Sequence, residues 1–476
     1  MLLQEISKFI SLPEDLIRCV FAIVLSVKLD ISPPLWLMMV GMPSSAKTDL
    51  VSIFRKLDFV YFIDSMTMNP FASGYVPANK GKSYDLLSEL NNKCFICKDY
   101  TTIFSLNEET TKKLLGEMVS IYDGEFAKYT PTRGYISYQS QFSHIGCITP
   151  VALNKHQKYL NIVGPRFMLY RLPPLDEKRR LDGFNIAWSV ENRKKAISSC
   201  GELVKSYFEN FLKMAPIHFV ITNSETKSIL EQLAVVMART RGIILTSKGS
   251  FTNENGKQVS YVEITDKQVE EPWRAFQQLR NLGICLSILN GRSAISVDEI
   301  RILKNVVRSS MPAERADILD YFLNHSDVKA KDLSRITYKS VRTCQRILKE
   351  LEGLEIITSD FQGEGFIKNY SLHPDFKVLM SEGSISIHPS EKLSRYLYYI
   401  NLASLTDQEV LEAVDILKEK VVKNNLTLSS DLKNQYLNRA KIYEVEGKRR
   451  KIISDSIPNM EDQVAIEESL KDEVPF

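Results

Sequence analysis

The segment from Gly41 to Thr48 carries residues whose types and spacing suit phosphate binding. It reads Gly-Met-Pro-Ser-Ser-Ala-Lys-Thr, a loop that opens with glycine and closes with a lysine and a hydroxyl residue. The backbone N–H groups of such a loop surround a polyphosphate, Lys47 reaches the outer phosphates, and the Thr48 hydroxyl binds Mg²⁺. The pattern predicts ATP as the ligand. The loop residues predicted to bind it are Gly41, Pro43, Ser44, Ser45, Ala46, Lys47 and Thr48.

The flanks of this loop predict the strand and the helix that must position it. Residues 34–40 form an apolar run that suits a buried strand, and residues 47–57 are amphipathic with helical spacing. A helix that begins at the loop adds the positive end of its dipole to the phosphate site. Ala46 stands where the usual pattern has glycine, so it is either a decayed position or the mark of a family.

An acid at the end of a second apolar strand would complete the magnesium site. Residues 94–98 form such a run, and Asp99 follows it. Asp99 is therefore predicted to bind Mg²⁺ with Thr48, although an acid after a strand can also simply cap a loop. Many ATPases place glutamate next, to polarise the attacking water, but this chain has Tyr100. The acids left open as replacements are Asp64, Glu117, Asp123 and Glu125.

Two further strands are predicted to carry polar residues beside the nucleotide. Residues 143–149 end in Thr149, whose hydroxyl can sense the γ-phosphate or position water. Arg166 precedes a strand at residues 168–172, where the ATP of a neighbouring subunit would find an arginine that stabilises charge on the transferred phosphoryl group. The alternative for Arg166 is a surface arginine paired with an acid.

The order of these motifs resembles the AAA+ ATPases of the minichromosome-maintenance (MCM) type, and more closely the MCM-like replication helicases of bacterial mobile elements and phages. The resemblance rests on Ala-Lys-Thr in the loop, the strands that end in Asp99 and Thr149, and Gly-Pro-Arg-Phe around Arg166, and it covers roughly residues 11–310. The family has glutamate at the position of Tyr100 and asparagine at that of Thr149. The resemblance implies a P-loop α/β sheet with a helical lid, a ring of six with ATP between subunits, and Arg239 of the lid on a γ-phosphate.

Residues 121–138 alternate bulky and polar side chains around a Pro-Thr-Arg-Gly turn, which predicts a β-hairpin. In the resembling rings a hairpin at this place projects into the central channel and grips DNA. Lys128 and Arg133 would then bind phosphates, and Tyr129 or Tyr135 would stack on bases. The alternative is a solvated hairpin with ordinary basic residues.

Residues 312–376 predict three helices followed by a hairpin, which is the pattern of a winged helix-turn-helix domain. Basic residues recur at three- and four-residue steps along the third helix and predict a face that binds duplex DNA. These residues are Lys339, Arg342, Arg346 and Lys349. Winged helices also serve as protein docking units, which is the alternative.

Composition sets the frame for these motifs. The chain has 476 residues and a net charge of +3, so contact with nucleic acid must come from local patches rather than from the global field. Neither a signal peptide nor a run long enough to cross a bilayer is recognisable, which predicts a cytoplasmic protein without membrane contact. The seven cysteines are scattered and are predicted to be reduced core thiols.

The predicted organisation is an α/β AAA+ P-loop sheet with a helical lid, an α+β winged helix-turn-helix domain and a helical, partly disordered C-terminal tail. The predicted boundaries are a lead-in helical segment at 1–30, the nucleotide-binding core at 31–222, the lid at 223–311, the winged helix at 312–376 and the extension with its charged tail at 377–476.

The predicted function is an ATP-dependent DNA helicase or translocase in the replication initiation of a mobile element or phage. It would act as a homo-hexamer, with single-stranded DNA in the channel, duplex DNA at the winged helix, and a primase or loader as a partner. The main rival is an ATP-switched DNA-binding regulator that does not unwind DNA, which Tyr100 favours because a missing water activator slows phosphoryl transfer. A protein remodeller whose hairpin grips polypeptide is the third reading.

Overall fold

The computed structural model describes residues 2–29, 31–75, 85–156, 163–189, 192–214, 224–252, 258–290, 292, 294–361, 368–379 and 407–423, with scattered positions between 437 and 450. The chain divides into two compact units. The first comprises Met1–Leu333 and Ser340–Ile385, and the second comprises Ser334–Lys339 and Ser386–Phe476.

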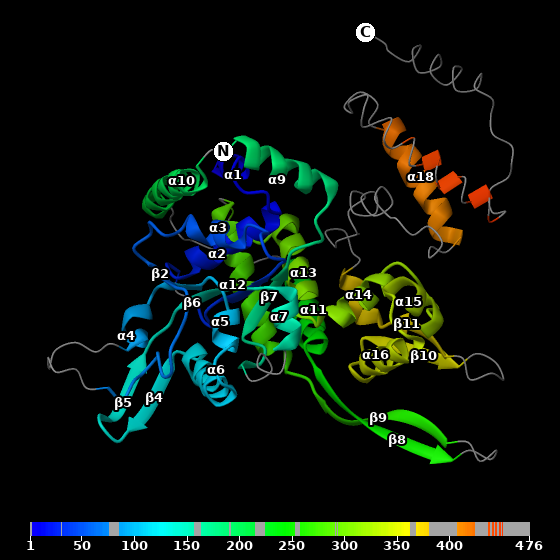
Figure 1. Cartoon of the computed structure of the whole chain (residues 1–476), viewed down its shortest axis with the longest axis horizontal. Helices are drawn as coiled ribbons and strands as arrows, with labels where there is room; N and C mark the ends of the chain where they lie inside the picture. The colour runs from blue at the N-terminus through cyan, green and yellow to red at the C-terminus, as the bar shows by residue number, and fades with distance from the viewer. Residues whose placement is uncertain are drawn as a thin grey trace, which may run out of the picture. The chain divides into compact units, whose positions relative to one another are not determined.

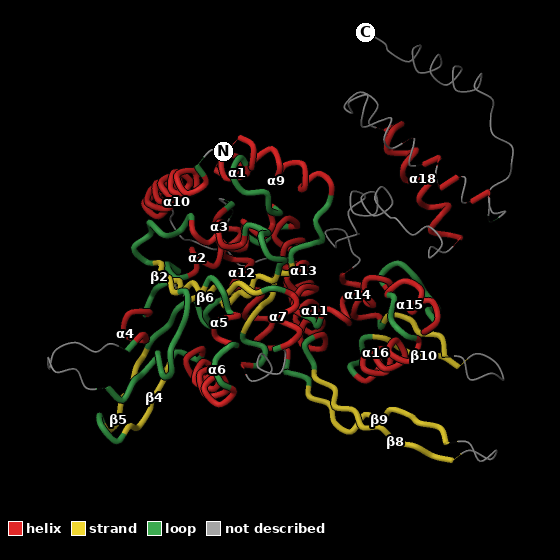
Figure 2. The backbone as a smooth tube through the Cα atoms, viewed as in Figure 1, coloured by secondary structure: helices red, strands yellow, loops and turns green. Residues whose placement is uncertain are grey.

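A five-stranded parallel sheet forms the centre of the first unit (Figures 1 and 2). In spatial order its strands are β2 (Val60–Ile63), β3 (Cys94–Cys97), β6 (Ser143–Ile148), β1 (Trp36–Val40) and β7 (Phe167–Arg171). Every residue of β1, β3 and β6 is buried, as inner strands of a parallel sheet require. The strands predicted from the apolar runs are confirmed to within two residues at each end.

Helices cover both faces of this sheet, so the region around it is a three-layer α/β/α structure. On one face Leu37 and Met39 belong to a core shared with α2 (Glu14–Ser26), α3 (Lys47–Ser52), α10 (Arg193–Met214), α12 (Pro272–Leu289) and α13 (Val297–Ser310). On the other, Trp36, Met38 and Val40 belong to a core shared with α4 (Leu86–Leu90), α5 (Thr101–Phe104), α6 (Glu108–Tyr122) and α7 (Pro150–Lys155). Successive side chains of β1 therefore point to opposite faces of the sheet and belong to two separate hydrophobic cores.

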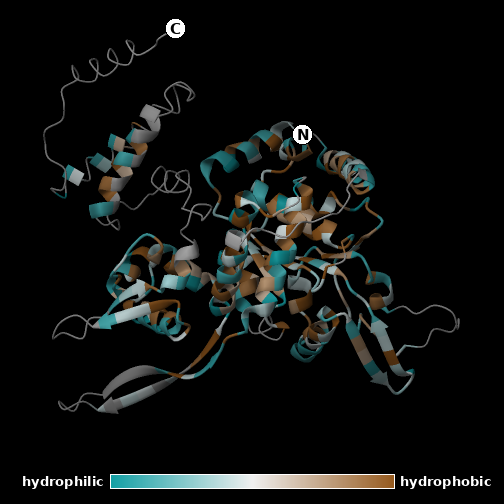
Figure 3. Cartoon of the chain, turned by 180° about the vertical axis from the view of Figure 1, so that it is seen from behind, coloured by the Kyte–Doolittle hydropathy of each residue, from teal (hydrophilic) through white to brown (hydrophobic). Residues whose placement is uncertain are grey.

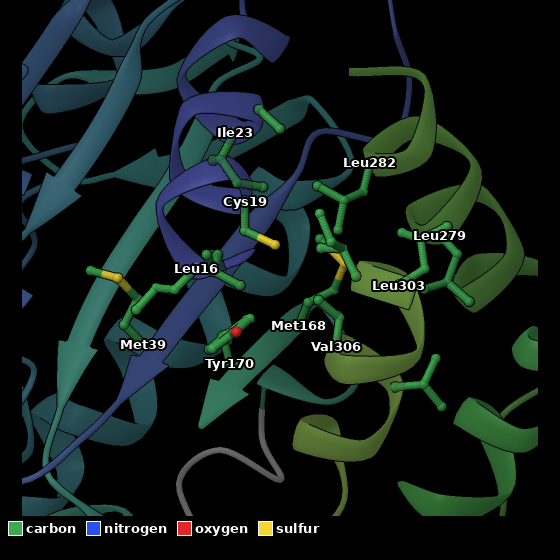
Figure 4. Packing of buried hydrophobic residues seen from close by; sticks show 14 of the residues in the cluster. Leu16, Cys19, Ile23, Met39, Met168, Tyr170, Leu279, Leu282, Leu303 and Val306 are labelled. Atoms are coloured by element: carbon green, nitrogen blue, oxygen red, sulfur yellow. The ribbon is translucent and has the colours of Figure 1, made fainter. Parts of the chain in front are cut away.

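The first of these cores is seen closely in Figure 4, where side chains from one strand pair and three helices meet. The labelled residues are Leu16, Cys19 and Ile23 of α2, Met39 of β1, Met168 and Tyr170 of β7, Leu279 and Leu282 of α12, and Leu303 and Val306 of α13. Figure 3 shows apolar residues gathered in the sheet and in the helices that cover it. Two further helices, α1 (Leu2–Ser7) and α9 (Glu177–Ser189), belong to this region.

Three helices and a long hairpin follow the sheet. Helices α11 (Ser224–Thr240), α12 and α13 contact one another, and α12 also packs on α2 while α13 packs along β7. The hairpin of β8 (Ile243–Thr252) and β9 (Gln258–Gln268) joins α11 to α12 and carries a bulge between Leu245 and Thr246. A capping box opens α13, because Glu299 accepts a hydrogen bond from the Ser296 N–H at 2.8 Å.

The next module has the predicted order of three helices and a hairpin. Its elements are α14 (Ala313–Phe322), α15 (Ala330–Thr337), α16 (Val341–Gly353), β10 (Ile357–Phe361), β11 (Lys368–Leu372) and the short 3₁₀ helix η1 (Pro374–Leu379). Arg315 of α14 is buried and donates to the Gly242 carbonyl at 2.6 Å and to Glu350 at 3.4 Å, which ties α14 to α16 and to the end of α11.

The described part of the second unit contains α18 (Asp407–Lys423), a helix within the helical extension predicted at residues 377–476. Residues 380–406 and 451–476 of this extension, with its charged tail, lie outside the described residues. All seven cysteines are buried and none forms a disulfide. Among the described residues, no helix is long and apolar enough to cross a bilayer.

Candidate functional site

Lys47 closes the glycine-to-threonine loop on itself. Its ammonium donates to the carbonyls of Gly41 at 2.6 Å and Met42 at 2.8 Å and to the Ser45 hydroxyl at 3.0 Å. The residue is buried, and this burial lowers the pKa of its ammonium, opposed by the nearby Cys147 thiol and by the Asp99 carboxylate. A phosphate that enters the loop would compete with neutral carbonyls for a lysine already directed into it, and the exchange favours the anion.

The loop backbone adopts the left-handed conformation twice, at Ser44 with φ of 60° and at Ala46 with φ of 62°. Glycine occupies this conformation without cost, which explains why the usual pattern has glycine at the position of Ala46. An alanine reaches it at a cost of roughly 1 to 2 kcal/mol. Side chains approach Gly41 closely, because a Cβ atom there would lie 2.9 Å from Leu172 and from the Ser45 hydroxyl, and both side chains would have to shift.

The parallel sheet brings three of the predicted residues to one edge. The Gly41 N–H donates to the carbonyl of Ile148 at 3.1 Å, and the Tyr100 N–H donates to the carbonyl of Cys147 at 2.9 Å. The loop after β1, Asp99 after β3 and Thr149 after β6 therefore all lie beyond the carboxyl ends of neighbouring strands, where open α/β sheets bind ligands.

Asp99, Thr48 and Thr149 offer oxygen atoms at this edge. Asp99 and Thr48 are exposed, and the Asp99 carboxylate accepts a hydrogen bond from the Thr101 N–H at 2.9 Å. A carboxylate and a hydroxyl are ligand types that Mg²⁺ prefers, so the residues fit the predicted ion. Thr149 caps α7 by accepting from the Ala152 N–H at 3.3 Å, which leaves its hydroxyl proton for another acceptor.

Tyr100 lies inside the core rather than at the edge. Its hydroxyl is hydrogen-bonded to His144 Nε2, and His144 Nδ1 lies 2.8 Å from the carbonyl of Phe95. Gly146 makes room for the ring, because a Cβ atom there would lie 2.6 Å from Tyr100 Cε2. The side chain after Asp99 is thus packed in the core on one face of the sheet and does not reach the end of the sheet that carries Lys47.

Arg166 lies at the other end of the sheet. It precedes β7, whose first residue Phe167 pairs with Trp36, whereas the loop follows Val40 at the far end of β1. Five strand residues separate the two ends by about 15 Å. Arg166 donates to the carbonyls of Val119 at 3.1 Å and Val163 at 3.0 Å.

Charged side chains of both signs surround Arg166. Asp123 lies 3.5 Å away, and the guanidinium is mostly buried. Burial and then the positive charge of Arg274 lower the pKa of the Arg166 guanidinium, while Asp123 raises it. Arg241 is buried nearby, where it donates to the carbonyl of Phe167 at 3.2 Å and pairs with Glu270 at 3.2 Å. The sequence gives no signal for this cluster, because its members come from distant segments.

Arg239 is engaged with the C-terminal helical module. Its guanidinium donates to Asp375 at 2.9 Å and to the carbonyl of Glu355 at 3.3 Å. The predicted γ-phosphate contact by Arg239 would therefore require these interactions to break. In the arrangement described, Arg239 couples α11 to the segments that flank β10 and β11.

The two predicted cations of the β4–β5 hairpin, formed by Glu125–Thr130 and Gly134–Gln139, are turned toward the chain. Lys128 donates to Glu117 at 2.8 Å and to the carbonyl of Ala72 at 3.1 Å. Arg133 pairs with Asp85 at 2.5 Å and donates to the carbonyl of Ser73 at 2.9 Å. Lys128 thus holds the hairpin against α6, and both cations bind residues that precede α4. Neither side chain projects from the tip of the hairpin.

Two large aromatic side chains of this hairpin are exposed. Tyr129 and Tyr135 are directly opposite each other in the antiparallel register, and their exposed fractions are 76% and 71%. Ala127 and Ser137 follow on the same face, so small residues flank the aromatic pair. The alternation of bulky and polar residues predicted the hairpin, but only the register shows that both tyrosines share its outer face.

The basic residues predicted on the third helix of the C-terminal module differ in their surroundings. Arg342 is exposed at the start of α16 and Lys349 is half-buried on the same helix. Arg346 pairs with Glu314 of α14 at 3.1 Å and also with Glu350. Lys339 precedes the helix, and its carbonyl accepts a hydrogen bond from Ser334. The positive charge of this face is therefore partly neutralised at Arg346.

Comparison of the chain with models of known protein families gives no match, and neither does comparison with curated protein sequences. The class that the fold defines is an α/β protein with a parallel five-stranded sheet compatible with a P-loop core.

Proposed function

We propose that the chain is an AAA+ type ATPase that moves along single-stranded DNA as a ring. The observation that carries the proposal is the sheet edge where the Lys47 loop lies beside Asp99 and Thr149. In this proposal the loop holds ATP, Thr48 and Asp99 hold Mg²⁺, and the Thr149 hydroxyl donates to the γ-phosphate. The ion would neutralise charge on the β- and γ-phosphates, and Lys47 would stabilise the same charge from the other side.

The placement of Arg166 supports a site shared between two copies of the chain. Within one copy this arginine is separated from the loop by the length of β1. In a head-to-tail ring the sheet end that carries Arg166 faces the next copy's phosphate edge, which would supply the missing cation. The hexameric ring itself is an expectation from the family resemblance.

The exposed tyrosine pair supports single-stranded nucleic acid as the polymer. Every base has a flat face on which an aromatic ring can stack without regard to sequence, as a translocating motor requires. The hairpin is clamped by Lys128 and Arg133, so the tyrosines are presented on a fixed support. The module of α14, α15, α16 and its hairpin is proposed to be a winged helix that binds duplex DNA through α16.

Strand displacement tests this function. The wild-type chain should separate a forked duplex in the presence of ATP and Mg²⁺, and Lys47→Ala should abolish both nucleotide binding and strand separation. Glu202→Gln, which removes an exposed partner of Lys56, is the control. Unwinding that survives Lys47→Ala would contradict the proposal.

A second function is favoured by one observation. Because Tyr100 is buried, the position after Asp99 carries no water activator, and a chain that binds ATP but hydrolyses it slowly would act as a switch. Such a regulator of replication, transcription or transposition would bind duplex DNA in a nucleotide-dependent way and would not separate strands in the same assay.

A further inference from the structure

We propose that Asp64 is the carboxylate that activates the attacking water. The inference rests on the proposed ATP hydrolysis and concerns the same sheet edge. Asp64 follows β2, the strand next to the one that carries Asp99, and Ile63 pairs with Cys97 in the parallel register. The two acids therefore leave neighbouring strands at the carboxyl end of the sheet, the end that also carries the loop, with β3 and β6 lying between β2 and β1.

The position directly after Asp99 is excluded by its packing. Tyr100 has no exposed surface, and it is held by the backbone bond to Cys147 and by the side-chain bond to His144. Gly146 leaves only enough room for the tyrosine ring. The Tyr100 side chain cannot turn outward without breaking its bond to His144, so it serves as an anchor for the turn that carries Asp99.

The other three acids lie elsewhere. Glu117 on α6 is paired with Lys128 of the hairpin. Asp123, directly after α6, lies 3.5 Å from Arg166, at the opposite end of the sheet from the loop. Glu125 begins β4 and is exposed on the hairpin. Asp64 is thus the only one of the four that leaves a strand of the sheet at its carboxyl end.

Local contacts fix the turn of Asp64 to the turn of Asp99. The Thr102 hydroxyl lies 3.1 Å from the carbonyl oxygen of Asp64 and 2.8 Å from that of Asp99. The Lys98 ammonium lies 2.5 Å from Oδ1 of Asp64. The Asp64 side chain is nevertheless 70% exposed. Lys98 would keep Asp64 oriented while the carboxylate remains open to water.

The step that this geometry supports is direct hydrolysis. The oxygen of a water molecule forms a bond to the γ-phosphorus as the bond from that phosphorus to the bridging oxygen breaks. Asp64 accepts a proton of the water and later releases it to solvent. The products are ADP, which keeps the electron pair of the broken bond, and inorganic phosphate.

Asp64→Asn should lower the rate of ATP hydrolysis without a large change in nucleotide affinity. The variant should bind a fluorescent ATP analogue within about threefold of wild type, whereas kcat should fall at least about 100-fold, as loss of a general base does. Asp64→Glu should recover part of kcat. Lys98→Met, which frees the carboxylate, should lower kcat less and leave affinity unchanged. Thermal unfolding of each variant checks the fold.

The matched control is Glu202→Gln. Glu202 is also exposed and pairs with a lysine, Lys56, at 2.5 Å, but it lies on α10 and not at the strand ends. Its loss should leave kcat unchanged. Wild-type turnover in Asp64→Asn, or a loss found instead in Glu117→Gln or Asp123→Asn, would overturn the assignment to Asp64 alone. Nucleotide binding unaffected by Lys47→Ala, or no ATP hydrolysis by wild type with and without DNA, would overturn the ATPase itself.

Discussion

At the scale of single residues, the Gly41–Thr48 loop contains a strained alanine, and the neighbouring strand β6 carries a buried histidine. Ala46 holds a backbone conformation that glycine reaches freely, and Lys47 follows it directly as the first residue of α3. The orientation of the lysine thus depends on a conformation that its neighbour does not favour. His144 shares a hydrogen bond with Tyr100 and so belongs to the support of the turn that carries Asp99.

Ala46→Gly should stabilise the protein. The substitution relieves the left-handed strain at position 46, of roughly 1 to 2 kcal/mol, and loses part of this to the greater freedom of glycine in the unfolded chain. The free energy of unfolding should rise by roughly 0.5 to 1 kcal/mol in urea titrations. Nucleotide affinity should stay within about threefold, since the loop keeps its path. A loss of stability would mean that the alanine methyl group makes a contact worth more than the strain.

Stability should fall with acid because of His144. Burial lowers the pKa of this imidazole to about 4 from its ordinary 6.5, although the bond to the Phe95 carbonyl opposes the shift. Between pH 6.5 and pH 4, therefore, His144 binds a proton in the unfolded chain but not in the folded chain. The contribution of the neutral His144 imidazole to the free energy of unfolding is complete above pH 6.5 and is lost as the pH falls toward 4. The free energy of unfolding should fall over this interval by at most about 1.4 kcal/mol per pH unit.

Urea titrations between pH 7 and pH 4 measure this slope. His144→Gln should flatten the pH dependence in that interval while lowering stability at pH 7, because the Tyr100 hydroxyl loses its partner. Ser143→Ala is the matched control, since it removes a buried hydrogen bond of 3.0 Å to Ile23 from the same strand without removing a titrating group. An unchanged slope in His144→Gln would assign the acid lability to other residues.

At the scale of elements, the β4–β5 hairpin divides its residues by face. The inner face carries Lys128 and anchors the hairpin on Glu117, whereas the outer face carries Tyr129 and Tyr135. Stability and ligand contact are therefore separated by the two-residue period of the strands. The same division explains why the cations that looked suited to phosphate are used within the chain.

Replacing both tyrosines by serine should weaken binding to single-stranded DNA without changing the melting temperature. Base stacking contributes about 1 to 3 kcal/mol per base, so the affinity should fall at least about tenfold. Fluorescence anisotropy with a labelled oligonucleotide measures the loss. Lys128→Met should lower the melting temperature and leave the affinity for single-stranded DNA unchanged. It leaves the mostly buried Glu117 carboxylate without its cation, which costs about 1 to 3 kcal/mol of stability. Unchanged DNA affinity in the double variant would remove the tyrosines from the polymer site.

At the scale of the whole molecule, the proposed active site is split between the two ends of the sheet. Lys47 belongs to one end and Arg166 to the other, so each copy would contribute half of two different sites. A heterologous contact of this kind repeats from copy to copy and closes into a ring when the rotation allows. Activity would then depend on assembly.

Two inactive variants should restore activity when mixed. Lys47→Ala retains its arginine and Arg166→Ala retains its loop, so a contact between the two rebuilds one complete site. With random mixing at equal amounts, about a quarter of the sites should be complete. The ATPase rate of the mixture measures this recovery, and each variant alone is the control. A mixture as inactive as its components would place Arg166 outside the site.

Local pattern alone determined the elements of this protein. The apolar runs, the turn at residues 131–134 and the capping box at Ser296 act over a few residues, and they give elements close to their predicted places in the described part of the chain. The helix predicted at residues 47–57 is shorter than predicted, because it ends at Ser52. The loop at Lys47 was recognisable for the same reason, because its chemistry depends on consecutive residues.

Tertiary structure decided which side chains are available. Whether Lys128 reaches DNA or Glu117, whether Tyr100 points outward or toward His144, and which acid lies beside Asp99 all depend on contacts between distant segments. A charged or aromatic residue has the same sequence signal in either setting, since burial and pairing come from elements that meet only in the folded chain. The sequence by itself therefore determined the elements and the pattern of the proposed phosphate loop, whereas packing determined which residues lie around that loop.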